Sequence, residues 1–178
     1  MEQDSRKILD IALGLIQKYD EEQAGRVENI EAKEDRYEDE LGTYLVKLNN
    51  KDLSEKDSHS VSIMLHCIGD FERISDHAVN IMESARELYE KNLSFSVQAK
   101  TELQVLIATV GRIVDTAYEV FDKQDMNLTC DVEPLEEIVD ELSKELKRRH
   151  VNRLRLGECT IEMGFILTDL ITSPVSYT

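Results

Sequence analysis

The sequence contains no tryptophan, and only two of its 178 residues are proline and only seven are glycine. Proline and glycine most often end helices and form tight turns, so their scarcity leaves few positions where the backbone must turn sharply. With 33% charged and 41% hydrophobic residues, this composition favours long amphipathic helices over a β-sheet or a disordered chain.

The three cysteines lie far apart, at Cys67, Cys130 and Cys159, and form no C-x-x-C pair. This pattern indicates neither a disulfide framework nor a thiolate zinc site, and it is typical of a reducing compartment. The first residues lack the basic and then apolar order of a signal peptide, and no apolar run approaches the roughly 20 residues that span a bilayer. We therefore expect a soluble, cytoplasmic chain without direct membrane insertion.

The sequence has fewer basic than acidic residues. It contains 21 Lys and Arg and 37 Asp and Glu, which gives a formal net charge of −16. Such a surface repels nucleic-acid phosphates and anionic lipid headgroups, and it attracts cations. It also repels free phosphate, unless a metal or a local arginine cluster reverses the field. The charge therefore argues against a nucleic-acid-binding protein.

One basic patch departs from this acidic background: Lys147–His150 is followed closely by Arg153 and Arg155. It lies near the expected end of a helix, where cations balance the helix dipole. Contact with an acidic partner or a lipid headgroup is the alternative.

Known catalytic sites need residue types at spacings that this sequence does not contain. It has no glycine-rich phosphate loop, no H-E-x-x-H and no E-x-x-H pair, and no serine or cysteine stands in a recognisable nucleophile turn. The sequence therefore predicts a protein that is not an enzyme, with no cofactor other than metal ions.

Apolar residues recur at helical spacing along nearly the whole chain, which predicts six helices and an all-α fold. The clearest break is at Leu93–Ser96. Two patterns recur in the same order in each half: Ile8–Ala12 resembles Ile113–Ala117, and Asp35–Leu41 resembles Glu136–Leu142.

This internal repeat predicts two tandem three-helix bundles, in residues 1–93 and 94–178. Each bundle is expected to be a short helix followed by two longer ones. The last helix of the second bundle is expected to be truncated at Ser173 and Pro174.

Acidic residues recur in pairs four positions apart. The pairs are Asp35 and Asp39, Glu72 and Asp76, and Glu136 and Asp140. Residues four apart share a helix face, so pairs from neighbouring helices would bring many carboxylate oxygens together, as in bundle proteins that hold two cations. In a chain with 37 acidic residues, such pairs also arise by chance on solvated helix faces, which is the commoner explanation.

The stretch Asp70–Ile81 resembles the E-R-I-x-D-H-A-x-N-I motif of the PhoU family of phosphate-uptake regulators. Glu31–Leu41 and Glu133–Leu142 fit the weaker motif of the second helix in each PhoU repeat. The resemblance implies two tandem three-helix bundles whose paired helices carry E(D)-x-x-x-D motifs. Some members of the family bind iron or zinc clusters through these motifs. The resemblance therefore implies that the three acidic pairs are ligands of divalent, iron or zinc ions.

A narrower likeness covers Arg153–Glu162 and Phe165–Ser173, which resemble the PhoU-type domain of bacterial sodium/phosphate cotransporter-like proteins. It implies a regulatory domain at the cytoplasmic face of the membrane, which modulates phosphate transport and has the transporter membrane domain as its partner. The alternative is a free-standing PhoU regulator of a phosphate-import ATPase and its sensor kinase. A third possibility, a di-metal oxidase of the ferritin type, is disfavoured because the E-x-x-H pair is missing.

The end of the sequence departs from the family pattern, in which the last helix continues into a second E-R-x-x-D-H motif. Here Pro174–Thr178 stands in its place. The second half therefore retains only Glu136 and Asp140, and we expect weak metal binding there unless another chain supplies carboxylates. An incomplete bundle also exposes apolar surface, at Ile138 and Ile166 among others, which favours a homodimer.

Overall fold

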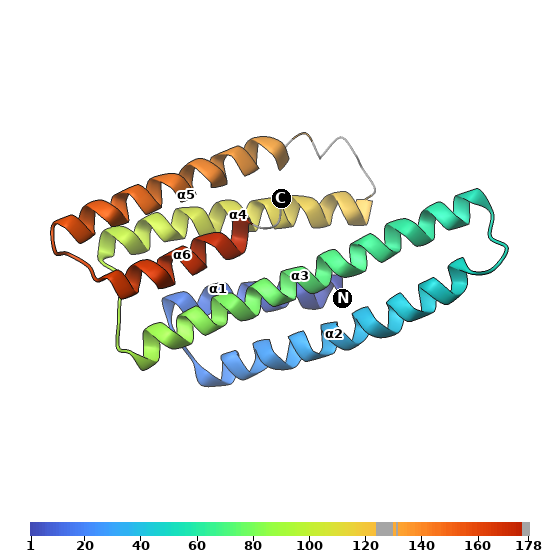
Figure 1. Ribbon diagram of the computed structural model, residues 1–178, viewed down its shortest axis with the longest axis horizontal. Coiled ribbons are helices and arrows are strands. Elements are labelled where there is room, and N and C mark those ends of the chain that lie inside the picture. The colour runs from blue at the N-terminus through green and yellow to red at the C-terminus, as the bar shows by residue number, and fades with distance from the viewer. Residues whose placement is uncertain (124–129, 131, 176–178) are drawn as a thin grey trace. The chain divides into compact units, whose positions relative to one another are not determined.

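The structure is a computed structural model that describes residues 1–123, 130 and 132–175 of the chain. These residues form six α-helices (Figure 1), which are α1 (Glu2–Gln17), α2 (Glu21–Asn49), α3 (Glu55–Glu90), α4 (Val97–Lys123), α5 (Val132–Arg155) and α6 (Ile161–Val175). The described residues contain no strand, and the predicted all-α fold is confirmed. None of the helices in this part of the chain has both the length and the apolar content of a membrane span.

Contacts between residues divide the chain into two compact units, Met1–Met82 and Glu83–Thr178. The first unit holds α1, α2 and the larger part of α3, and the second holds the end of α3 with α4, α5 and α6. The division falls inside a helix, because α3 continues without a break from Glu55 to Glu90. The internal repeat and its boundary at residue 93 stay predictions.

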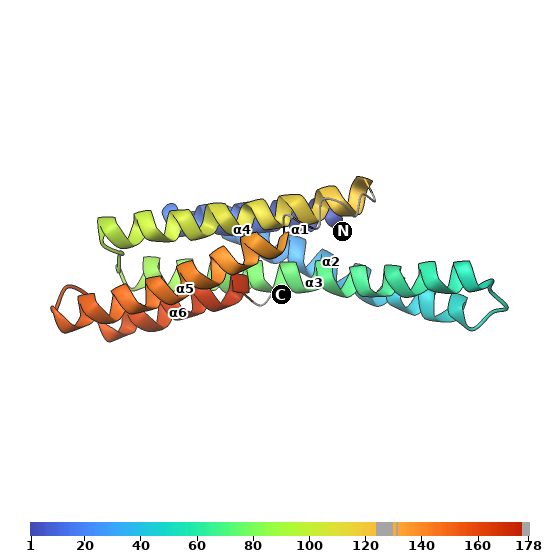
Figure 2. The ribbon, with the colours of Figure 1, turned by 90° about the horizontal axis from the view of Figure 1, so that it is seen from above.

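Side-chain caps begin two helices of the first unit. The side chain of Asp20 accepts a hydrogen bond of 3.0 Å from the backbone N–H of Gln23 at the start of α2. Ser54 Oγ accepts one of 3.2 Å from the N–H of Asp57 at the start of α3. Each cap satisfies a donor that has no partner inside the helix. Only residues 50–54 separate the two helices, which run antiparallel (Figure 2).

The core of the first unit is made by one apolar face of each helix, and α1 packs directly against α2. Its buried apolar side chains are Ile8, Leu9, Ala12, Leu15, Ala24, Val27, Leu45, Val61, Ala78, Ile81 and Met82.

In the second unit α4 packs against α5, and α5 packs against α6. At the start of α4, Ser96 Oγ accepts a hydrogen bond of 3.2 Å from the backbone N–H of Ala99. At the start of α6, Thr160 Oγ1 accepts one of 3.3 Å from the backbone N–H of Met163. Gly157 has a φ of +73° just after α5, a left-handed conformation that glycine adopts without a steric penalty. The buried apolar side chains include Leu103, Leu106, Val110, Val114, Leu135, Val139, Leu146, Ile166, Leu167, Leu170 and Ile171.

The described part of α6 has 15 residues, against 36 in α3. Ile138 is 46% exposed, as predicted for an incomplete bundle, whereas Ile166 is 1% exposed. Ile166 is buried because α6 turns it towards the core of its own unit. The exposed apolar surface is therefore smaller than predicted, and the homodimer stays a prediction.

Candidate functional site

Carboxylates gather on facing parts of α2 and α3 in the first unit. We call this group the acidic cluster; its members are Glu31, Asp35, Glu38, Glu72 and Asp76. The three residues on α2 are spaced by four and then three positions, and the two on α3 are spaced by four. Each set therefore lies on one face of its helix.

Glu72 shows most clearly that the two faces act on one another. It is half-buried, and burial raises its pKa to about 7, with further increases from Asp76, Glu38 and Asp35. Burial disfavours the ionised form of a carboxyl group, and neighbouring negative charges disfavour it further. Near neutral pH, Glu72 therefore holds a proton about half of the time, in a place where a cation would relieve the same repulsion.

Glu31 on α2 shows the same interaction between carboxylates of the two helices. Burial raises the pKa of Glu31, and the charges of Asp35 and Asp76 raise it further. Asp35 and Asp76 thus act on both Glu31 and Glu72, although the four residues come from two helices. The cluster is therefore a single electrostatic unit.

The structure brings together three of the four carboxylates that the sequence places in the first half: Asp35, Glu72 and Asp76. Asp39 is exposed and is not among the groups that raise the pKa of Glu72 or Glu31. Its neighbour Glu38 faces α3 instead, because one residue corresponds to a rotation of about 100° around a helix.

The pair predicted in the second half lies on α5. Glu136 is half-buried and Asp140 is exposed, and an Asp140 carboxylate oxygen lies 3.7 Å from Lys144 Nζ. An exposed ion pair of this kind contributes little to stability. As metal ligands, all six predicted residues remain predictions.

The donor set of the acidic cluster fits a cation that prefers oxygen, because carboxylates are hard ligands. Within residues 1–123, 130 and 132–175, however, no three His, Cys, Asp or Glu side chains are arranged so that they could hold a metal ion. The carboxylates of α2 and α3 would have to rotate towards one another before three of them could bind one cation.

Glu34 is a buried carboxyl group that the sequence pattern did not single out. It is 0% exposed, burial raises its pKa, and its Oε1 lies 3.7 Å from the α-amino nitrogen of Met1. Glu34 stands seven residues after the buried Val27, and this heptad spacing marks the core face of α2. That spacing is the signal that would have found it.

The part of the chain that carries the acidic cluster is similar to a known protein family. Residues 1–85 match the family model described as the PhoU domain. This segment, just under half of the chain, is similar to the PhoU domain. The resemblance predicted from Asp70–Ile81 is thereby confirmed, and all five carboxylates of the acidic cluster lie inside the matched segment.

A curated relative supports the PhoU assignment over a similar length. The chain is 28% identical over 97 residues to the phosphate-specific transport system accessory protein PhoU homolog 1 of Thermotoga maritima. The matched segment is 54% of this chain and 41% of the relative. The chain therefore spans about two fifths of the length of that PhoU relative.

A solved structure extends the likeness to the second unit. The crystal structure of PhoU from Pseudomonas aeruginosa matches with a TM-score of 0.89 and covers 99% of this chain and 84% of the other. The sequence identity is 20%, so this likeness shows the fold. The part of the chain that follows the matched residues 1–85 therefore also has the PhoU fold.

Proposed function

We propose that this chain is a regulatory PhoU-type protein that acts on a phosphate-transport system in the cytoplasm and catalyses no reaction itself. The observation that carries the proposal is the match of residues 1–85 to the PhoU domain. The Thermotoga maritima relative, named as an accessory protein of phosphate-specific transport, supports the same role. The partners would be proteins of phosphate transport and of its signalling.

Phosphate uptake in a strain of the source organism that lacks the protein tests this role. We expect uptake to rise at high external phosphate, because a regulator that restrains transport is gone, and we expect the chain supplied in trans to restore the restraint. Unchanged uptake at both high and low phosphate would contradict the proposal.

Of the two candidate roles, the free-standing accessory protein is supported better than the cotransporter domain. The two similar proteins named above are a PhoU accessory protein and PhoU itself. The cotransporter domain remains the second candidate, supported by the likeness in Arg153–Glu162 and Phe165–Ser173. The DNA upstream of the coding region separates the two, because membrane spans encoded there in the same frame would favour the cotransporter.

We also propose that the acidic cluster binds a divalent cation, such as an iron or zinc ion, as a regulatory ligand. The support is the raised pKa of Glu72, about 7, in a group of five carboxylates. A bound cation would neutralise carboxylates that burial and mutual repulsion now keep partly protonated. Asp35, Glu72 and Asp76 would provide the first ligands, with Glu31 and Glu38 beside them.

Elemental analysis of the chain purified without chelator tests the cation. We expect bound metal in the unchanged protein, loss of that metal in the double variant Asp35→Asn/Glu72→Gln, and no loss in Asp10→Asn, which changes an exposed carboxylate of α1. A lack of bound metal, together with equal thermal stability with and without chelator, would contradict the proposal.

A further inference from the structure

The second unit contains a groove of about 680 Å³ between the first turns of α4 and the last turns of α5. We call it the arginine groove; it is lined by Gln98, Thr101 and Glu102 of α4 and by Arg148, Arg149 and Arg153 of α5, among others. We propose that the arginine groove binds a phosphate-bearing anion.

The charge around the groove is opposite to that of the chain. Lys147–Arg155 carries five cations and no carboxylate, whereas the formal net charge of the protein is −16. The carboxylates that stand against these cations are Glu102, Glu145 and Glu158. Glu158 is exposed, so water and salt screen its charge. A local excess of positive charge is what an anion needs to approach an otherwise repelling surface.

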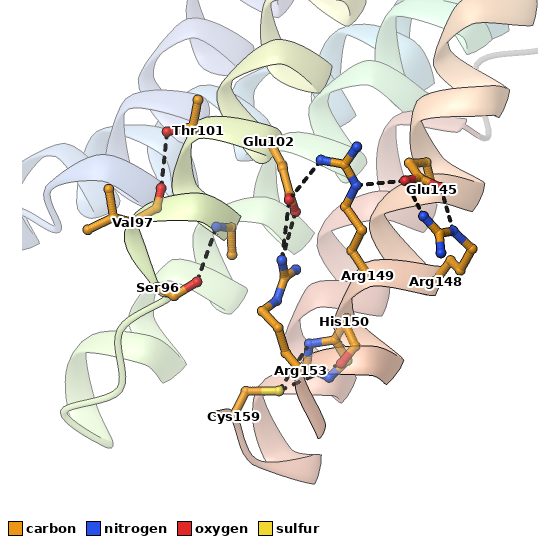
Figure 3. A network of polar contacts seen from close by, with 11 residues as sticks. Ser96, Val97, Thr101, Glu102, Glu145, Arg148, Arg149, His150, Arg153 and Cys159 are labelled. Carbon is orange, nitrogen blue, oxygen red and sulfur yellow. Dashed lines mark hydrogen bonds and ion pairs between the residues drawn. The ribbon is translucent and has the colours of Figure 1, made fainter. Parts of the chain in front are cut away.

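Two carboxylates hold the three arginines in place (Figure 3). Glu145 accepts hydrogen bonds of 2.7 Å from Arg148 and from Arg149, and these bonds lower the pKa of Glu145 to about 2. Glu102 accepts bonds of 3.0 Å from Arg149 Nη1 and from Arg153 Nη1. The guanidinium groups are therefore oriented in advance.

Arg153 has donor capacity that the protein does not use. The residue is only 6% exposed, and it bonds both oxygens of Glu102 through Nη1 alone. Its buried Nη2 has no hydrogen-bond partner in the described residues. A buried donor of a charged group without a partner costs stability. An anion oxygen in the groove would supply the acceptor that Arg153 lacks.

The start of α4 adds further donors at the same place. Ser96 Oγ accepts the N–H of Ala99, whereas the backbone N–H groups of Val97 and Gln98 precede the first intrahelical bonds of this 27-residue helix. Both residues line the groove. The N-terminus of a helix carries a partial positive charge and favours phosphate groups.

The groove is larger than a single phosphate requires. Its volume lies in the range of roughly 300–1,000 Å³ that is usual for small-molecule sites. Val97 and Leu156, which also line it, are 82% and 63% exposed and give it an apolar rim. This combination favours an anion with more than one phosphate group, or one phosphate group with an organic body, over inorganic phosphate alone.

Calorimetric titration of the whole chain tests the site, with inorganic phosphate, pyrophosphate and ATP as probes in chelator at low ionic strength. We expect saturable binding of at least one probe at one site per chain. If pyrophosphate binds most tightly, the groove recognises the phosphate groups alone. If ATP binds most tightly, the groove also contacts the nucleoside part of the ligand. Binding of inorganic phosphate as tight as that of either would contradict the preference for an anion larger than inorganic phosphate.

Variants decide whether the arginine groove is the site. Arg149→Gln and Arg153→Lys should each weaken binding about tenfold or more, because each removes charge-assisted hydrogen bonds. Arg112→Gln changes an exposed arginine of α4 outside the groove and should bind the anions like the unchanged protein. Arg149 is 49% exposed in its side chain, so its substitution decides the question if the Arg153 variant does not fold.

The inference is overturned by either of two results. One is that none of the three anions binds saturably. The other is that Arg112→Gln weakens binding as much as Arg149→Gln does, because the effect would then come from net charge and not from the groove.

Discussion

Glu72 is the single residue at which burial and like charge act together most strongly in the acidic cluster. Its pKa of about 7 in the folded chain exceeds the ordinary value of 4.5 for glutamate. The folded state therefore binds this proton more tightly than the unfolded state does. The stability that the proton contributes is complete below pH 4.5 and is lost as the pH rises through 7.

Glu72→Gln should remove this pH dependence, because glutamine stays neutral at every pH. We expect the variant to be more stable than the unchanged protein above pH 7, in chelator, and the difference to disappear below pH 4.5. Urea unfolding at several pH values measures it. Asp39→Asn is the matched control, since Asp39 is exposed and lies outside the cluster. Equal pH dependence of stability in Glu72→Gln and in the unchanged protein would contradict the electrostatic role of Glu72.

Helix packing in the second unit gives a prediction at the level of elements. Gly164 on α6 lies over the buried ring of His150 on α5, and a Cβ on Gly164 would stand 2.6 Å from His150 Nε2. Gly164→Ala should therefore destabilise the protein by about 1–3 kcal/mol, because the buried ring would have to shift to make room for the Cβ.

The control for Gly164→Ala is Gly111→Ala on α4. A Cβ on Gly111 would meet no atom within 4 Å, so alanine should stabilise this helix by about 0.5–1 kcal/mol. Urea unfolding of both variants measures the difference. If the two variants shift stability in the same direction, the close contact between α5 and α6 is not as described.

The helices themselves were predictable from the sequence, because their apolar residues recur at a period that only an α-helix satisfies. The sequence did not predict which face of α2 is buried. Apolar spacing favours Leu41 and Tyr44 as core positions, yet they are 41% and 62% exposed, whereas Glu34 is fully buried. When a charged residue occupies a core position, periodicity alone cannot tell which neighbouring carboxylates face the next helix. For that reason the sequence indicated Asp39, whereas the structure places Glu38 in the cluster.

The arginine groove was only half predictable for a related reason. The sequence showed the cations of Lys147–Arg155, which are usual near the end of a helix. It did not show that Glu102, some fifty residues earlier on α4, would bind Arg149 and Arg153. Contacts between helices far apart in sequence depend on how the helices pack, and one sequence does not determine that.

At the scale of the whole molecule, the chain consists of two units with separate cores. A fragment of residues 1–93 should therefore fold by itself, with high helical content and cooperative unfolding. Its urea midpoint should be lower than that of the whole chain. The reason is that the buried residues Ala85 and Leu88 belong to the second unit and would become exposed to solvent in the fragment. Circular dichroism measures both properties. A fragment without helical structure would contradict the division into units.

The acidic cluster requires that carboxylates from α2 and α3 share one electrostatic environment. The most direct measurement is an NMR titration of the Glu72 side-chain carboxyl carbon in chelator-treated protein. We expect a midpoint near pH 7, as burial and the charges of Asp76, Glu38 and Asp35 require. A midpoint near 4.5, the ordinary value for glutamate, would contradict the cluster, because Glu72 would then lie in water, apart from the other carboxylates.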